Sequence, residues 1–323
     1  MRQDSGESSG WPAGWVGCSS CIPDPGVRFN HSRPLIRPHS TDPKVNMDKY
    51  YNPADSDAIS QFNAYLAEFY EKNKRPMPWR DDITPFRVVV SEIMLQQTQV
   101  PRVMDKFPQF IQTFPDFNAL AGASLEDVMR AWQGLGYNRR AKYLLDIARS
   151  IVEKWNGIVP DDPKDLKILP GIGTATAGSI VAFSYNRPVV FIETNIRRVF
   201  IHHFFQDQAD VSDKDIIPVI SRALNQNNPR EWYYSLMDYG TFLAGKIKNP
   251  NRRSRHYAVQ SPFAGSDREI RGQVIKVLLE KGPTQYHQLV GIVGDQHSRT
   301  EKIISQMIIE GLIVKDHTTI HFS

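Results

Sequence analysis

Residues 169–178, with the sequence Leu-Pro-Gly-Ile-Gly-Thr-Ala-Thr-Ala-Gly, constrain this chain most strongly. Gly171 and Gly173 flank one apolar residue, and such a turn reaches backbone angles that a Cβ atom disfavours. A helix of small residues is expected directly after it, at 174–184. The N–H groups that open this helix lie at its positive dipole end and can bind an anion, for which a DNA phosphate is our candidate. An ordinary two-glycine turn between packed helices is the alternative that the motif alone leaves open.

The composition is that of a soluble globular protein with room for two or three domains. The chain has 323 residues, 41% of them hydrophobic and 23% charged. Its net charge of +4 permits a nucleic-acid partner without requiring one. A run of about 18 apolar residues, as a membrane span needs, is absent, and so is a secretory signal pattern. We therefore expect a cytoplasmic protein, nucleoid-associated if its source is prokaryotic, that is not secreted and has no membrane partner.

The N-terminal 46 residues are expected to be a disordered tail, because they are rich in Ser, Gly and Pro and lack periodicity. Met47 directly precedes the first regular segment, and we expect it to be the true start. The only two cysteines, Cys18 and Cys21, lie in this tail. Their spacing is compatible with a metal or redox pair, but no second pair accompanies them, so a chance spacing is favoured. A cluster held by four thiolates is excluded, and no metal or cofactor is expected.

Apolar periodicity and caps predict a mainly α-helical chain. Residues 47–245 are expected to form one helical domain, followed by a basic connector at 246–266 that is either a solvated linker or a phosphate-contacting loop. Helices are expected at 56–72, 84–95, 101–114, 124–132, 138–155, 174–184, 194–200, 216–224 and 231–242.

Residues 267–323 have a different pattern, with helices expected at 268–281, 285–290 and 297–310 and a hairpin around residues 316–317. Three short helices and a hairpin indicate a winged-helix-like domain. The third helix would be its recognition helix, with His297, Ser298, Arg299 and Lys302 near its start. Such domains contact either nucleic acids or proteins.

Two carboxylates are candidates for acid–base chemistry. Glu92 lies on an otherwise apolar helix, and in an apolar site its pKa would rise enough for it to deliver a proton near neutral pH. Glu193 lies at the start of another helix. The alternatives are a solvent-exposed Glu92 and a Glu193 that only complements the helix dipole. Paired carboxylates suit cleavage of a glycosidic bond through a sugar cation, and the phosphate-binding turn would extend this to a base flipped out of DNA.

Several blocks of sequence resemble adenine DNA glycosylases of the MutY type, in order and at the family's spacing, from about residue 55 to 245. The resemblance implies the helix-hairpin-helix glycosylase fold, with two helical lobes and the active site between them. The blocks are 78–80 (Pro-Trp-Arg), 91–100 (Ser-Glu-Ile-Met-Leu-Gln-Gln-Thr-Gln-Val), 134–137 (Gly-Leu-Gly-Tyr), 169–173 (Leu-Pro-Gly-Ile-Gly) and 195–199 (Asn-Ile-Arg-Arg-Val).

The resemblance also implies roles for individual residues. Glu92 matches the acid that protonates adenine and handles the water, Glu193 stands at the position of the catalytic Asp, and Asn195 matches an active-site Asn. Trp79 and Tyr234 are expected at the base pocket. The expected contacts with DNA are Leu95, Gln96, Gln97, Gly171, Gly173, Thr174, Arg139 and Arg80.

The chain departs from the family in ways that concern substrate and cofactor. Glu193 is one methylene longer than Asp. Ala175 stands where endonuclease III has its lysine nucleophile, so Schiff-base chemistry and strand cleavage are not expected. The four-cysteine cluster loop is missing, and a winged-helix-like tail replaces the domain that checks for 8-oxoguanine. Tyr234 lies near the position where relatives contact adenine with Gln or Glu.

These observations predict a monofunctional, monomeric DNA glycosylase of base excision repair that acts on double-stranded DNA with a mismatch or lesion. Its expected reaction is removal of adenine mispaired with 8-oxoguanine or guanine. The alternatives are a glycosylase for thymine or uracil opposite guanine, and an inactive lesion-binding protein.

Overall fold

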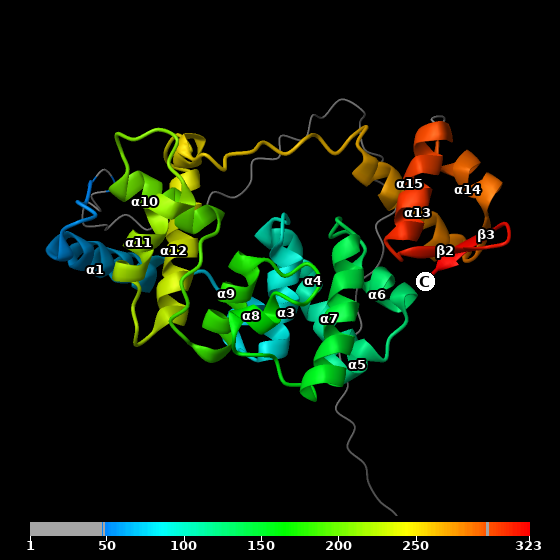
Figure 1. Cartoon of the computed structure of the whole chain (residues 1–323), viewed down its shortest axis with the longest axis horizontal. Helices are drawn as coiled ribbons and strands as arrows, with labels where there is room; N and C mark the ends of the chain where they lie inside the picture. Colours follow the sequence, from blue (N-terminus) through cyan, green and yellow to red (C-terminus); the bar gives the residue numbers. More distant parts are fainter. Residues whose placement is uncertain (1–46, 48, 295–296) are drawn as a thin grey trace, which may run out of the picture. The chain divides into compact units, whose positions relative to one another are not determined.

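The computed structural model describes residue 47 and residues 49–294 and 297–323. This part of the chain is mainly helical, which confirms the predicted fold class (Figure 1). The expected N-terminal tail and the Cys18–Cys21 pair lie outside the described residues. Among the described residues, no helix is long and apolar enough to cross a membrane.

One group of helices joins the start of the described chain to its middle. α1 and α10 both pack against α12, and α11 contacts α1 and α10. Asp55 caps α1 by accepting from the N–H of Asp57, so the start of α1 is encoded by adjacent residues. The group consists of α1 (Ser56–Asn73), α10 (Thr194–Phe204), α11 (Asp213–Ala223) and α12 (Pro229–Ala244).

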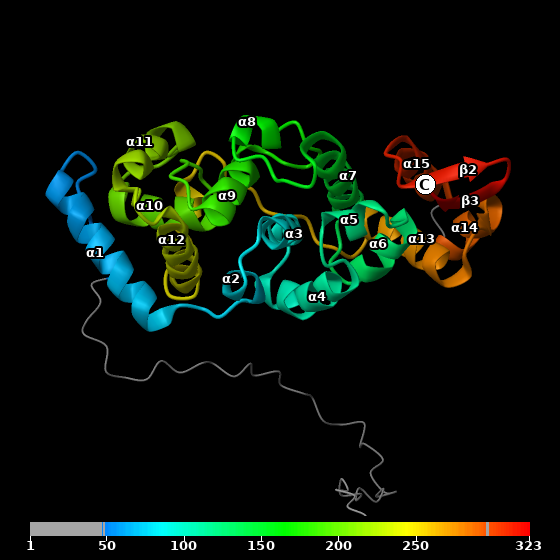
Figure 2. The same cartoon turned by 90° about the horizontal axis from the view of Figure 1, so that it is seen from below.

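The second group has α3 at its centre, with α4, α7 and α9 packed against it (Figure 2). Thr84 caps α3 through the N–H of Arg87, and Pro85 is its first residue, as expected. A contact between α9 and α12 links the two groups. The second group consists of α2 (Pro78–Asp81), α3 (Pro85–Leu95), α4 (Val100–Thr113), α5 (Phe117–Ala121), α6 (Leu125–Trp132), α7 (Arg139–Trp155), α8 (Pro163–Leu166) and α9 (Thr174–Tyr185).

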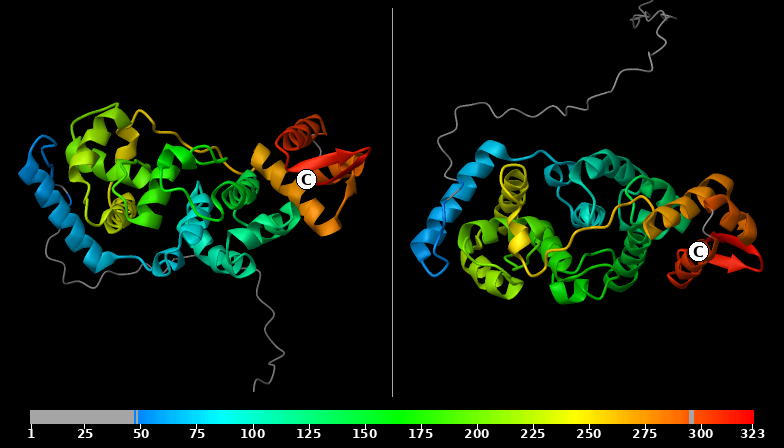
Figure 3. Two further views of the ribbon diagram at one scale, coloured as in Figure 1. Left: turned by 60° about the horizontal axis from the view of Figure 1, so that its bottom comes forward. Right: turned by 90° about the horizontal axis from the view of Figure 1, so that it is seen from above.

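The C-terminal elements form a block of their own, orange to red in Figure 3, and α13 contacts α6. Their order is α13 (Asp267–Lys281), β1 (Thr284–Gln285), α14 (Tyr286–Val293), α15 (His297–Ile309), β2 (Ile313–Asp316) and β3 (Thr319–Phe322). The strands are antiparallel in the order β1-β3-β2, with Thr284 opposite Ile320 and Ile313 opposite Phe322. The hairpin agrees with expectation, and β1 is an addition to it. The winged-helix assignment stays a prediction with which this element order agrees.

The basic connector differs from a solvated linker in its first part. Residues 250–253 form a 3₁₀ turn, η1 (Pro250–Arg253), in which Pro250 and Asn251 are buried. η1 packs on α10, and Ser254 forms a β-bridge with Val211. The chain therefore packs with the first helix group up to Ser254, nine residues beyond the expected boundary at 245.

Candidate active site and nucleic-acid interface

Glu92 is half-buried on α3, and all the other residues from Val88 to Met94 are buried. Its Oε2 accepts a hydrogen bond of 2.5 Å from the Ser179 hydroxyl of α9. The pKa of Glu92 is raised from its ordinary 4.5 to about 7, mainly by burial. The hydrogen bond from Ser179 and the charge of Arg80 lower this pKa, whereas the charge of Glu193 raises it. A carboxyl group with this pKa can give and recover a proton near neutral pH. The half-buried position of Glu92 and its bond to Ser179 of α9 do not fit the solvent-exposed alternative.

Glu193 is the N-cap of α10. Its Oε1 accepts from the backbone N–H of Asn195 at 2.7 Å and of Ile196 at 2.8 Å, and Oε2 accepts from Asn195 Nδ2 at 3.3 Å. Burial raises the pKa of Glu193, while the two N–H bonds and the charges of Arg198 and Arg197 lower it. Glu193 is thus a helix-terminal carboxyl group, as the alternative proposed, and its negative charge when ionised contributes to the raised pKa of Glu92 on the other helix group.

Asn195 is held by two residues that the sequence analysis did not single out. Arg198 Nη1 donates to Asn195 Oδ1 at 2.6 Å and to the carbonyl of Gly240 at 2.7 Å. A Cβ on Gly240 would lie 2.7 Å from both the Cβ and the carbonyl oxygen of Asn195. Gly240 therefore permits the close approach of α12 to α10. Its signal in the sequence is a lone glycine inside an otherwise regular helix, which indicates close packing.

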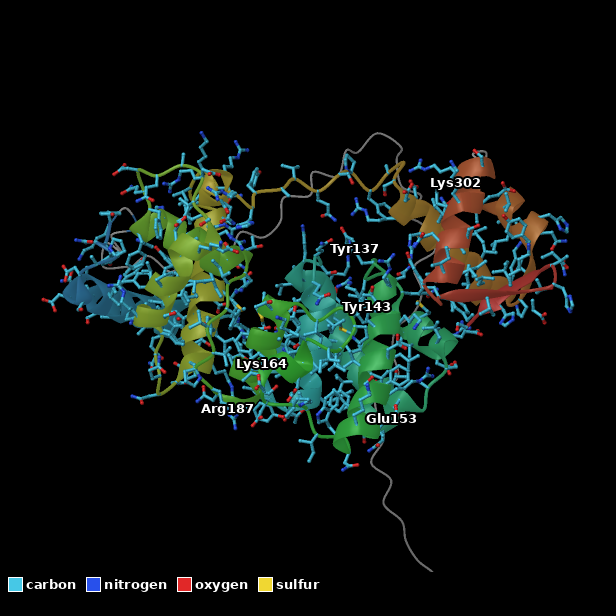
Figure 4. The ribbon with its side chains drawn as sticks, in the orientation of Figure 1. Tyr137, Tyr143, Glu153, Lys164, Arg187 and Lys302 are labelled. Atoms are coloured by element: carbon cyan, nitrogen blue, oxygen red, sulfur yellow. The ribbon has the colours of Figure 1, made fainter. Side chains whose placement is uncertain are left out.

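The hairpin places its two glycines in different situations. Gly171 has φ +74°, and a Cβ there would lie 2.5 Å from the ring of Tyr143, which α7 supplies (Figure 4). Gly173 has φ −89° and ψ 179°, which any residue adopts, and a Cβ there would meet nothing within 4 Å. The backbone angle that a Cβ disfavours, expected somewhere in this turn, is found at Gly171 and not at Gly173. Gly173 is instead the exposed N-cap of α9, and Thr174 is the first residue of that helix.

The glutamine-rich segment after α3 lies next to this hairpin. Gln96 Nε2 donates to the carbonyl of Gly171 at 3.1 Å and to Thr176 Oγ1 at 3.3 Å. Gln97 is exposed, with φ +54°, and Leu95 ends α3 in a half-buried position. The structure therefore brings together the expected DNA contacts of this segment and of the hairpin.

Arg140 organises the same region and was also missed. Its buried guanidinium donates to the carbonyls of Ile93, Met94 and Gln96 at 2.6–2.9 Å and to Gly136 at 3.0 Å. It joins the end of α3 to the loop before α7, and burial lowers its pKa to about 10. The only sequence signal was a pair of arginines beside a glycine-rich loop.

Two expected site residues, Arg80 and Trp79, lie in positions that need correction. Both Arg80 and Arg75 pair with Asp238 of α12, and the Arg80 guanidinium also covers the ring of Tyr234. An Arg80 side chain that is 8% exposed and paired with Asp238 does not fit the expected DNA contact. Trp79 is 4% exposed and packs against Phe107, so it belongs to the core instead of a base pocket.

Tyr234 and Arg139 have mixed outcomes. Tyr234 is buried and stacked on Phe183, but it is close enough to Glu92 for that charge to contribute to its raised pKa, after burial as the main cause. Arg139 pairs with Glu310, which follows α15, and Glu310 also binds Arg271. Tyr137, labelled in Figure 4 beside Tyr143, accepts from Arg268 at 2.8 Å. Arg139 therefore contacts the C-terminal block, and its DNA contact stays a prediction.

The segment after α12 does not fit the four-thiolate cluster that the resemblance implies. Residues 22–323 contain no cysteine. In the part of the chain that the structure describes, no group of three or more His, Cys, Asp or Glu side chains could hold a metal ion. η1 is held by polar side chains instead, because Asn251 Nδ2 donates to the carbonyl of Thr194 at 2.9 Å and Arg253 Nη2 to that of Ile201 at 3.1 Å.

The helical architecture around this hairpin is that of a base-excision DNA glycosylase fold. Residues 90–217 match the family model described as "HhH-GPD superfamily base excision DNA repair protein". A solved structure of a thermostable thymine-DNA glycosylase superposes with a TM-score of 0.53 at 19% identity, covering 59% of this chain and 90% of that one, and supports the fold alone.

Relatives in sequence define the family more closely. The adenine DNA glycosylase of Mycobacterium tuberculosis is 33% identical over 234 residues, which cover 66% of this chain and 77% of the relative. That of Mycolicibacterium smegmatis is 31% identical over 275 residues, covering 77% of this chain and 91% of the relative. The chain belongs to the adenine DNA glycosylase family.

Proposed function

We propose that this protein is a monofunctional DNA glycosylase that hydrolyses the N-glycosidic bond of adenine mispaired with 8-oxoguanine or guanine. The observation that carries the proposal is that Glu92 has a pKa at which it can be protonated near neutral pH. Glu92 lies on one helix group, and the charge of Glu193 on the other group contributes to this pKa. The relatives named adenine DNA glycosylase support adenine as the base.

The two carboxylates divide the reaction between them. Glu92 gives its proton to the extruded adenine, and the bond between the base and C1′ of the sugar breaks with its electron pair going to the base. Glu193 carries the negative charge that stabilises the sugar cation. The oxygen of a water molecule then bonds to C1′, and the proton released by that water returns to Glu92. The products are free adenine and an intact strand with an abasic site.

Contacts with the duplex are proposed at the hairpin and the segment after α3. The N–H groups at the start of α9 would bind a backbone phosphate beside Gly173, where the space for a Cβ is empty. Leu95, Gln96 and Gln97 would face the extruded base and its former partner. Arg139 would contact DNA through the part of its side chain that stays accessible beside its ion pair with Glu310.

The absence of strand cleavage is part of the proposal and rests on Ala175. A strand-cleaving glycosylase forms a Schiff base through an amine, and at this half-buried position of α9 the chain has a methyl group. The proposal also includes a cytoplasmic monomer that needs no iron–sulfur cluster, with residues 267–323 as a winged-helix domain.

Incubation with four duplexes tests the function. They carry A:8-oxoguanine, A:G, T:G and U:G pairs, and each is analysed with and without alkali. Alkali-dependent cleavage of the adenine strands only is expected. Cleavage of thymine or uracil strands alone would favour the pyrimidine alternative, and tight binding without cleavage would favour the inactive lesion-binding protein. Cleavage without alkali would overturn the monofunctional assignment.

A further inference from the structure

Ser179 contacts the proposed acid, although no motif pointed to it. It lies on α9 and is 2% exposed. Its Oγ is 2.5 Å from Glu92 Oε2 and 3.0 Å from the backbone carbonyl of Thr176, one turn earlier in the same helix. A buried serine between a carboxyl group and a carbonyl has two possible acceptors for its single proton.

This geometry satisfies both protonation states of Glu92. When Glu92 is ionised, the Ser179 hydroxyl donates to the carboxylate. When Glu92 is protonated, its O–H donates to Ser179 Oγ, and Ser179 turns its own proton to the carbonyl of Thr176. A hydroxyl that both donates and accepts keeps a hydrogen bond between Ser179 and Glu92 in either state.

We propose that Ser179 is a positioning residue that holds the Glu92 carboxyl group in one place while its proton leaves and returns. Since Ser179 lies on α9, whose N-cap is Gly173, it also connects the acid to the proposed phosphate site. The expected effect on excision rests on the proposed function, because there the proton of Glu92 is transferred to adenine.

The effect on pH dependence follows from the groups that face Glu92. These are Ser179 from α9, Glu193 at the start of α10, Arg80 from α2 and Tyr234 from α12. Burial and Glu193 raise the pKa of Glu92, whereas Ser179 and Arg80 lower it. Removal of the hydroxyl should therefore raise this pKa further, because the carboxylate loses a donor and its other neighbours stay.

The experiment compares wild type with Ser179→Ala and with Ser235→Ala as a matched control. Ser235 is a buried helical serine as well, but its Oγ donates at 2.6 Å to the carbonyl of Trp232. Single-turnover excision from the A:8-oxoguanine duplex is measured between pH 5 and 9. For Ser179→Ala the falling limb is expected to move up by about one pH unit, and the rate on the plateau to fall about tenfold. Ser235→Ala should keep the wild-type profile.

A titration without substrate separates this inference from the proposed function. The ¹³Cδ signal of Glu92, identified by its loss in Glu92→Gln, is followed against pH in the DNA-free protein. A higher pKa in Ser179→Ala supports the inference even if no adenine is excised. An unchanged pKa, or a pH–rate profile that superposes on wild type, would overturn it. Thermal unfolding of each variant ensures that folded protein is compared.

Discussion

Gln96 Nε2 lies 3.1 Å from the carbonyl oxygen of Gly171 and donates a hydrogen bond to it. These residues are 75 positions apart in the chain. The bond makes one continuous surface of the segment after α3 and the glycine hairpin, directly beside the helices that carry Glu92 and Ser179. Gln96 also donates to Thr176 Oγ1, and Ser179 bonds both the carbonyl of Thr176 and Glu92, so the segment after α3 and the acid have bonding partners on the same turn of α9.

The two hairpin glycines are expected to respond differently to alanine. Gly171→Ala should destabilise the fold by about 2 kcal/mol, because the residue has φ +74° and a Cβ there meets Tyr143. Gly173→Ala should leave the unfolding temperature unchanged but weaken duplex binding about tenfold, because a methyl group blocks the approach of the phosphate. Thermal unfolding and fluorescence anisotropy measure the two effects. Equal binding by Gly173→Ala and wild type would contradict the phosphate site.

Glu92→Gln is expected to abolish excision and to change the pH dependence of stability. Loss of the general acid should cost at least about 100-fold in single-turnover rate. The pKa of Glu92 is about 7 in the fold against an ordinary 4.5. A raised acid pKa means that the folded state binds the proton more tightly, so stability is lost as pH rises through this window. The glutamine variant escapes this loss.

Denaturation at two pH values measures that effect. The stability of Glu92→Gln relative to wild type should increase by about 2 kcal/mol between pH 5.5 and 8.5. An unchanged difference would mean that Glu92 is not held in an environment that favours its neutral form.

Two substitutions at Glu193 distinguish its role as the N-cap of α10 from the role of its negative charge. Glu193→Gln keeps an oxygen that can accept from the N–H groups of Asn195 and Ile196, so its stability should stay close to wild type. Glu193→Ala loses the cap and should be about 1 kcal/mol less stable. Both should lose at least about 100-fold in excision, because neither stabilises the sugar cation. Wild-type activity of the glutamine variant would remove Glu193 from the proposed mechanism.

Alanine substitutions of two neighbouring arginines in the connector are expected to affect different properties, one stability and the other DNA binding. Arg253 donates to the carbonyls of Ile201, Phe205 and Gln206 at the end of α10, whereas Arg252 is exposed. Arg253→Ala should therefore destabilise the protein by about 2 kcal/mol, since it leaves carbonyl groups unsatisfied. Arg252→Ala should leave stability unchanged and reduce the salt dependence of duplex binding by about one ion. The reverse pattern would contradict the structural role of η1.

Helix positions could be predicted from the sequence because adjacent residues encode them. Thr84 and Pro85 start α3 through contacts within one turn, and the apolar periodicity of α1 continues from cap to cap. β1 was missed because it is a two-residue strand whose partner, β3, comes more than thirty residues later. η1 was missed for a related reason, since its buried face is defined by α10, about fifty residues away.

The sequence by itself determined the chemical inventory of the site: two candidate carboxylates, a glycine hairpin, a methyl group at Ala175 and too few cysteines for a four-thiolate cluster. Tertiary structure alone decided the partners of these groups. It gave Glu92 a hydrogen bond from Ser179, and it paired Arg80 with Asp238 and Arg139 with Glu310. The physical reason is that backbone preference acts over a few residues. The charge, burial and pKa of a side chain depend instead on neighbours that only the packing of distant helices brings close.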